Sequence, residues 1–131
     1  MAKHNEIGKL GEKLATKWLT DKGYSIVTQN YLKKYGEIDI VARETDVIHF
    51  VEVKSVSYET KADMEDAVSR GTWRPEENVH FAKQQRLSRV IEVWLSENIY
   101  KGEWQIDILS VRIVPRERIA RFYLLDNVIF E

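Results

Sequence analysis

Two consecutive segments, GEIDIVAR at residues 36–43 and VIHFVEVKS at residues 47–55, decide the fold class of this 131-residue chain. Both are rich in β-branched and other apolar residues and have the length of a strand. Because side chains alternate along a strand, Glu52 and Lys54 share one face with Phe50, and both faces are largely apolar. This pattern is typical of a central strand covered on both sides. The two charged residues then need a partner or a metal ion, since a buried charge is otherwise costly.

The residues before this pair predict a helix and a further strand. Between residues 5 and 22, apolar side chains recur at three- and four-residue intervals, which predicts an amphipathic helix that ends at Gly23. Residues 24–31 are rich in β-branched and aromatic residues and predict a strand. The connections at residues 33–36 and 44–46 are short, so we expect the three strands to form an antiparallel meander.

The middle of the chain is less regular. Residues 56–73 are polar and show no clear period, which predicts a long loop, with a short helix at residues 62–69 as the alternative. A second long helix is expected at residues 76–97. Pro75 precedes it and carboxylates follow, and both suit the first turn of a helix.

Two further strands are expected at the end of the chain, at residues 104–114 and 119–130. The last one could be an edge strand that pairs with a partner, although a strand that returns to its own sheet is more ordinary. With 44% hydrophobic residues, the chain can bury one ordinary core. We therefore expect one α/β domain over residues 1–131, a central mixed β-sheet flanked by helices.

The composition excludes several kinds of site. Because the chain has no cysteine, disulfides, thiolate zinc sites and cysteine nucleophiles are excluded. No apolar run approaches the roughly 18 residues of a membrane helix, and residues 1–13 lack the apolar core of a signal peptide. We therefore expect a cytoplasmic protein without a membrane partner.

The net charge of −1 does not by itself indicate a protein that binds phosphate backbones. Net charge averages over all faces, however, so a local basic surface is the relevant test. A modest basic bias is found between residues 70 and 89, in Arg70, Arg74, Lys83, Arg86 and Arg89 against Glu76 and Glu77. Lys83, Arg86 and Arg89 flank the apolar stripe of the second helix and are either a solvated face or contacts for phosphates.

Three charged residues of the central strands have the chemistry of phosphodiester hydrolysis. If the strands are hairpin neighbours, Asp39 and Glu52 can share a cation, although the sequence does not fix the register. Magnesium accepts such oxygen ligands and can hold a phosphodiester while it activates a water molecule. Lys54 would orient that water or stabilise the charge that develops on phosphorus. The alternative is an ion network of the same residues that only ties the strands together.

The order of the motifs resembles a known family. GEID, followed a dozen residues later by EVK, looks like the core of the PD-(D/E)XK nuclease superfamily. GKLGEKLA, GEIDIVA, FVEVKS, RPEENV and IDILSV resemble, in this order, the YraN-like family of small bacterial proteins over nearly the whole chain. That family is similar to archaeal Holliday-junction resolvases, which cut branched DNA as dimers with magnesium. The resemblance therefore implies a restriction-endonuclease-like fold.

The resemblance also implies a role for individual residues. Asp39 and Glu52 would be metal ligands, and Lys54 would be the catalytic lysine. Glu12 of the first helix would add a ligand, and the carbonyl oxygen of Val53 would complete the shell. Together these groups would bind Mg²⁺ or Mn²⁺.

Further residues could contribute to the same site. Glu37 could replace Glu12, and Gln85 or Lys83 could contact the site or the scissile phosphate. Two other polar strand residues, His49 and Asp107, are interpreted as structural, with a contact to the site as the alternative for Asp107.

We therefore expect a metal-dependent endonuclease that hydrolyses DNA phosphodiesters. Branched DNA is favoured over a specific sequence, because the chain contains no helix-turn-helix or zinc-finger pattern to read bases. The alternatives are a catalytically inactive nucleic-acid-binding or scaffold module on the same fold, and an adaptor for other proteins. A homodimer is a further option that the sequence leaves open.

Overall fold

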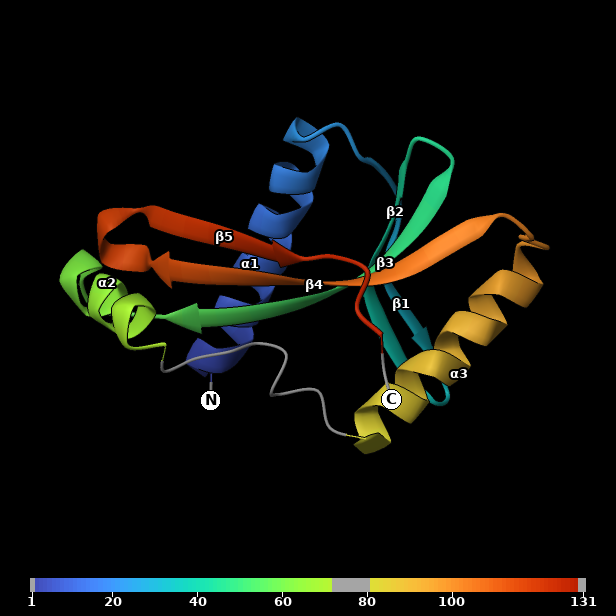
Figure 1. The fold of residues 1–131 in the computed structure, drawn as a ribbon. Coiled ribbons are helices and arrows are strands. Elements are labelled where there is room, and N and C mark those ends of the chain that lie inside the picture. The colour runs from blue at the N-terminus through green and yellow to red at the C-terminus, as the bar shows by residue number, and fades with distance from the viewer. Residues whose placement is uncertain (1, 72–80, 130–131) are drawn as a thin grey trace.

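The computed structural model describes residues 2–71 and 81–129 (Figure 1). Its elements follow in the order α1 (Ala2–Asp21), β1 (Ser25–Lys33), β2 (Gly36–Glu44), β3 (Val47–Ser57), α2 (Lys61–Arg70), α3 (Phe81–Glu97), β4 (Glu103–Val114), the 3-10 helix η2 (Pro115–Glu117) and β5 (Ile119–Leu125). The five strands form one sheet in the order β1-β2-β3-β4-β5.

The sheet is mixed, as expected from the sequence. β1, β2 and β3 form an antiparallel meander, β4 pairs with β3 in parallel, and β5 returns antiparallel to β4. The parallel step requires a crossover, and α2 and α3 lie in that part of the chain. The predicted α/β class with a mixed sheet and flanking helices is confirmed.

Helices α1 and α3 cover different faces of this sheet (Figure 1). The core beneath α3 contains Ile48 and Phe50 of β3, whereas Val51 of the same strand belongs to the core beneath α1. β3 is therefore buried on both faces, which explains why its sequence is an almost continuous apolar run. None of the helices in the described ranges is long and apolar enough to cross a membrane.

A glycine allows α1 to approach β3 closely. A Cβ atom at Gly11 would lie 1.7 Å from the Oγ and 2.8 Å from the Cβ of Ser55, which is far inside van der Waals contact. Only a residue without a side chain fits here, so Gly11 sets the distance between helix and strand. The next residue on the helix is Glu12, which is thereby brought close to the sheet.

The prediction of a loop at residues 56–73 is wrong for most of that range. β3 continues to Ser57 and α2 occupies Lys61–Arg70, which agrees with the short helix held as the alternative. Thr60 begins this helix by accepting a hydrogen bond from the Asp63 amide, and Gly71 ends it in the left-handed region at a φ of 62°. Met64 is the one buried residue of α2, so its apolar side was too narrow to produce a visible period.

The last strand is shorter than predicted. β5 ends at Leu125 instead of residue 130, and Asn127 adopts a φ of 54° that interrupts the strand conformation. The amide of Val128 then donates to the Ile106 carbonyl at 2.7 Å. The predicted start of the second helix, at Pro75 and residue 76, lies outside the described residues, and its end at Glu97 is confirmed.

Candidate metal centre

The site forms where β2 and β3 separate. Their ladder of pairs begins at Glu44↔Val47 and ends at Ile40↔Val51. Beyond that point the backbone amide of Val53 donates to Oδ2 of Asp39 at 2.8 Å. A side chain thus accepts the hydrogen bond of the strand amide, and Asp39 is fixed between the two strands.

The alternation of β2 changes at the same residue. Ile38 belongs to the core beneath α3, but Ile40, two residues later, belongs to the core beneath α1. Asn30 of β1 falls opposite Asp39, between the pairs Gln29↔Ile40 and Tyr31↔Ile38, and has a φ of 51°. The left-handed backbone of Asn30 therefore accompanies a local twist at the point where β2 carries its carboxylates.

Three carboxylates meet at this twist. Glu12 from α1, Glu37 and Asp39 from β2 each place one oxygen so that all three oxygens lie within 4.8 Å of one another. The amide of Asn30 forms a hydrogen bond with Glu12, which fixes one member of the group. The sequence treated Glu12 and Glu37 as alternatives, whereas the structure brings both to Asp39.

Glu52 lies beside this group but faces two lysines. Its Oε1 is 2.8 Å from Nζ of Lys83 on α3 and 3.5 Å from Nζ of Lys54 on the same strand. Its side chain is only 9% exposed, so this pairing satisfies a buried charge. The contact between Lys83 and the site, predicted as one of two options, is present.

The carboxylates are close enough to change each other's pKa. Burial and the charges of Glu52, Glu12 and Glu37 together raise the pKa of Asp39 to about 8, against the opposing effect of the hydrogen bond from Val53. Burial also raises the pKa of Glu12, together with the charges of Glu37 and Glu52. The surroundings therefore disfavour the charged form of both carboxylates.

The two lysines respond in opposite directions. Burial and the neighbouring Lys83 lower the pKa of Lys54. Burial would also lower the pKa of Lys83, but its hydrogen bonds and the charge of Glu52 outweigh this and raise it. Lys54 is therefore the lysine that gives up a proton more readily, and Lys83 is the one that neutralises Glu52.

These features fit a hard divalent cation. All the converging ligand atoms are carboxylate oxygens. Mg²⁺ and Mn²⁺ prefer such ligands, whereas softer metals prefer nitrogen and sulfur ligands. A cation would also neutralise the repulsion that raises the pKa of Asp39. Glu12, Glu37 and Asp39 could hold the ion, with Glu52 as a further ligand once it is released from Lys83.

The other residues predicted for the site have fewer contacts with the carboxylates. Val53 contacts the site through its amide, and a contact of its carbonyl with a metal stays a prediction. The Gln85 side chain is exposed and has no hydrogen bond with another described residue. Arg86 and Arg89 are exposed on α3, and the guanidinium of Arg89 lies 5.3 Å from the ring centre of Tyr35 in the β1–β2 turn.

One contributor was missed. Asn30 holds Glu12 and lies opposite Asp39, yet the sequence shows only a polar residue on an expected strand. The available signal was an asparagine within an expected strand, because asparagine adopts the left-handed conformation more readily than most residues.

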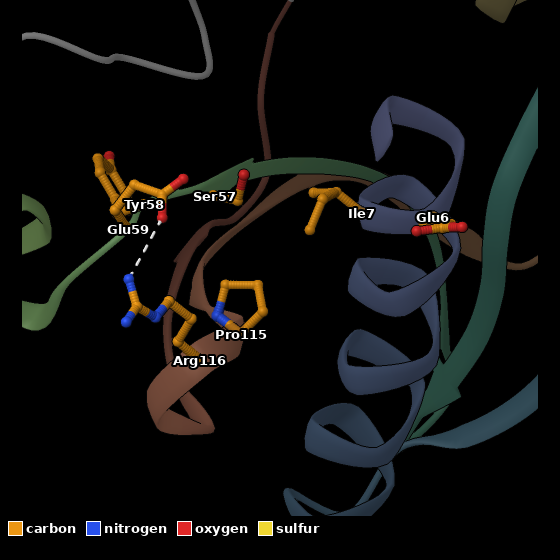
Figure 2. Close-up of a pocket in the computed structure, with 7 residues that line it drawn as sticks. All are labelled: Glu6, Ile7, Ser57, Tyr58, Glu59, Pro115 and Arg116. Carbon is orange, nitrogen blue, oxygen red and sulfur yellow. Dashed lines mark ion pairs between the residues drawn. The ribbon is translucent and has the colours of Figure 1, made fainter. Parts of the chain in front are cut away.

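A separate depression lies near the N-terminal part of α1. It has a volume of about 390 Å³ and lies among Glu6, Ile7, Ser57, Tyr58, Glu59, Pro115 and Arg116. Figure 2 shows Glu59 and Arg116 pointing toward each other across it, and their closest atoms are 3.9 Å apart. None of the predicted site residues lines this depression.

The two polar residues interpreted as structural form a buried pair. His49 Nδ1 lies 2.7 Å from Oδ2 of Asp107, which is fully buried. The other oxygen of Asp107 accepts from the Gln105 side chain at 2.8 Å and from the Asn127 amide at 2.9 Å. Asp107 therefore ties the chain after β5 to the sheet, and its contacts are with these residues instead of the carboxylate group.

Comparison with known proteins gives one consistent result. The family described as "Uncharacterised protein family UPF0102" matches residues 11–111. A UPF0102 protein of Dictyoglomus turgidum is 32% identical over 125 residues, covering 95% of this chain and 97% of the relative. Similar proteins of Nocardia farcinica (37% identical, 86% and 80% covered) and Thermotoga petrophila (39% identical, 82% and 85% covered) carry the same description.

Proposed function

This chain belongs to the uncharacterised family UPF0102, the YraN-like family that its motifs resemble, and we propose that it is a metal-dependent endonuclease of the restriction-endonuclease-like type. Its substrate is DNA, with branched DNA favoured, and its cation is Mg²⁺ or Mn²⁺. The observation that carries the proposal is the meeting of Glu12, Glu37 and Asp39 within 4.8 Å, near a half-buried lysine, Lys54, that pairs with Glu52.

A bound cation would polarise a phosphodiester and make a water molecule more acidic. The chain itself supplies the positioning. Asp39 is held by the Val53 amide, and Glu12 is held by Asn30 and by the close helix contact at Gly11. Pre-fixed ligands of this kind lose little entropy when the site assembles on a substrate.

Lys54 is the residue that would meet the reacting phosphate. Its side chain is 16% exposed, and its lowered pKa allows it to exchange a proton with water nearer to neutral pH than a free lysine. In its charged form it stabilises the negative charge that develops on phosphorus. Lys83 can keep Glu52 neutralised until a cation takes that carboxylate, because its Nζ is already 2.8 Å away.

The decisive experiment is cleavage of fluorescently labelled linear, flapped and four-way-junction DNA in Mg²⁺ or Mn²⁺. We expect the wild type to cut at least one substrate, and Asp39→Asn and Lys54→Ala to be inactive after identical purification. Asp46→Asn is the matched control, since Asp46 is an exposed acid in the β2–β3 turn. Cleavage that survives in Asp39→Asn, or in EDTA, would rule out this site as its source.

A non-catalytic nucleic-acid-binding module is the second candidate. The observation in its favour is the pairing of Glu52 with both Lys54 and Lys83, which is also what a purely structural ion network would show. The two functions differ in their response to metal. For the nuclease, Mn²⁺ should raise the melting temperature of the wild type but not of Asp39→Asn, because only the native site binds the ion. A binding module would retain DNA affinity without cleavage at any metal concentration.

A further inference from the structure

A groove opens from the carboxylate group along α1. It has a volume of about 460 Å³ and lies between α1 and β1. Its walls are Lys9, Glu12, Lys13 and Thr16 of the helix and Gln29 and Asn30 of the strand. Glu12 belongs to both the groove and the carboxylate group, so the two are continuous.

The lysines of this groove are available to an incoming anion. Lys9 and Lys13 are exposed, and neither forms an ion pair with a carboxylate of the described residues. Lys17, one turn further along the helix, is instead 3.2 Å from Asp21. The two free ammonium groups thus lie on the one stretch of α1 that leads to Glu12.

Apart from Glu12, the remaining walls of the groove are polar and uncharged. The Thr16 hydroxyl donates to the Glu12 carbonyl at 2.8 Å and is 3.4 Å from Oε1 of Gln29. Gln29 and Asn30 are exposed and carry amide N–H groups that can donate to phosphate oxygens. Lysine with neutral donors is the chemistry that contacts a nucleic-acid backbone without reading its bases.

We propose that this groove binds the phosphate backbone of one DNA strand and leads it to the carboxylate group, with Lys9 and Lys13 as its phosphate contacts. The proposal rests on the proposed function for its occupant, and it adds a second contact surface to the cations of α3. Because α1 and α3 cover different faces of the sheet, the strand would be held on both sides of the reacting phosphate (Figure 1).

The test is DNA binding by the double variant Lys9→Gln/Lys13→Gln. Fluorescence anisotropy of a labelled four-way junction and of a labelled single strand is measured in Ca²⁺, which accepts the same carboxylate ligands. Glutamine has nearly the helix propensity of lysine, so α1 should persist. The matched control is Lys61→Gln/Lys101→Gln, which removes two exposed charges that do not line the groove.

We expect the groove variant to bind roughly tenfold more weakly in 0.1 M salt, because two phosphate contacts are lost. The slope of log K against log salt should fall by about 1.8 on duplex arms, or by about 1.4 on a single strand. The control should keep the wild-type slope. Equal slopes for the groove variant, the control and the wild type would overturn the proposal.

Cleavage in Mg²⁺ separates the two proposals. If the wild type cuts DNA and the groove variant matches the control, the nuclease stands and the groove is not its strand path. If the wild type binds but never cuts, while the groove variant loses the predicted slope, the groove stands and the nuclease fails. Absence of DNA binding by the wild type in Ca²⁺ and Mg²⁺ would overturn both.

Discussion

Two buried aspartates, Asp107 on β4 and Asp39 on β2, belong to the same sheet but differ in the hydrogen-bond donors and charges around them. Asp107 is fully buried and has three hydrogen-bond partners among the described residues, His49, Gln105 and the Asn127 amide. Asp39 is 8% exposed, has the Val53 amide as its one hydrogen-bond partner in the described part of the chain, and faces the charges of other carboxylates. Both carboxyl groups lose hydrogen bonds to water when they are buried, but only Asp107 regains enough hydrogen bonds from the protein to compensate.

This difference separates a structural acid from one that awaits a ligand. The surroundings of Asp107 contain enough donors to satisfy it without any bound group. Those of Asp39 do not, and its pKa is raised to about 8 as a result. A buried acid that the protein does not neutralise is a feature of functional sites, because the missing partner is supplied by a metal or substrate.

The largest effect is expected when Asp107, the aspartate with a full set of hydrogen bonds, is removed. Asp107→Ala leaves His49, Gln105 and the Asn127 amide without their acceptor. We expect the free energy of unfolding to fall by about 3 to 5 kcal/mol, measured by urea denaturation. Asp107→Asn keeps one acceptor oxygen and should lose less. A loss below about 1 kcal/mol for Asp107→Ala would contradict the structural role.

Removing the unsatisfied acid should have the opposite effect on stability. Asp39→Asn removes a buried charge that Glu52, Glu12 and Glu37 repel. In EDTA at pH 8.5 its melting temperature should exceed that of the wild type, while cleavage falls at least about 100-fold, equivalent to about 2.7 kcal/mol. Calorimetry and the cleavage assay measure the two effects. A melting temperature below the wild type would show that Asp39 is as well satisfied as Asp107.

The approach of α1 to the site can be tested through its glycines. Gly11→Ala places a Cβ atom 1.7 Å from Oγ of Ser55, so we expect a loss of about 1 to 3 kcal/mol and weaker metal binding. Ser55→Gly in the same chain should restore part of both. Gly8→Ala is the control, because nothing lies within 4 Å of its added Cβ. That change should raise stability by about 0.5 to 1 kcal/mol.

The smallest expected effect is in the pH dependence of the metal-free protein. Since the pKa of Asp39 is raised to about 8 in the folded state, the folded protein binds its proton more tightly than the unfolded chain. The contribution of this protonated carboxyl to the free energy of unfolding is therefore complete below about pH 4, and it is lost as the pH rises toward 8. Relative to Asp39→Asn, the wild-type melting temperature should fall by a few degrees over this range. Mn²⁺ should reverse the fall, and an unchanged difference between the two proteins would contradict the raised pKa.

Sequence reasoning located the main parts of the site because they lie on long apolar strands. Asp39, Glu52 and Lys54 were conspicuous, since charges are rare in a strand that is otherwise buried. Glu12 and Glu37 were found as alternatives, because helix and strand positions cannot be compared without the packing between them. Lys9 and Lys13 gave no signal, as exposed lysines on an amphipathic helix are ordinary.

The errors have physical causes as well. α2 was predicted mainly as loop because a single buried residue, Met64, holds it to the sheet. β5 was extended too far because its regular pairing with β4 ends at Leu125 and the Asn127 amide binds the Asp107 side chain instead, a contact made across 20 residues of sequence. Local patterns record burial along an element, but they do not record which distant side chain takes a backbone hydrogen bond.

The sequence by itself determined the meander, the α/β class and the charged residues of the central strands, because hydrophobic periodicity is a local property of the chain. Only the tertiary structure decided that β2 twists at Asp39, that Gly11 lets Glu12 approach the sheet, and that Lys83 forms an ion pair with Glu52. These three facts depend on the register and on helix packing. They are set by the closest approach of backbones and by the balance of buried charges, which no single segment of the chain contains.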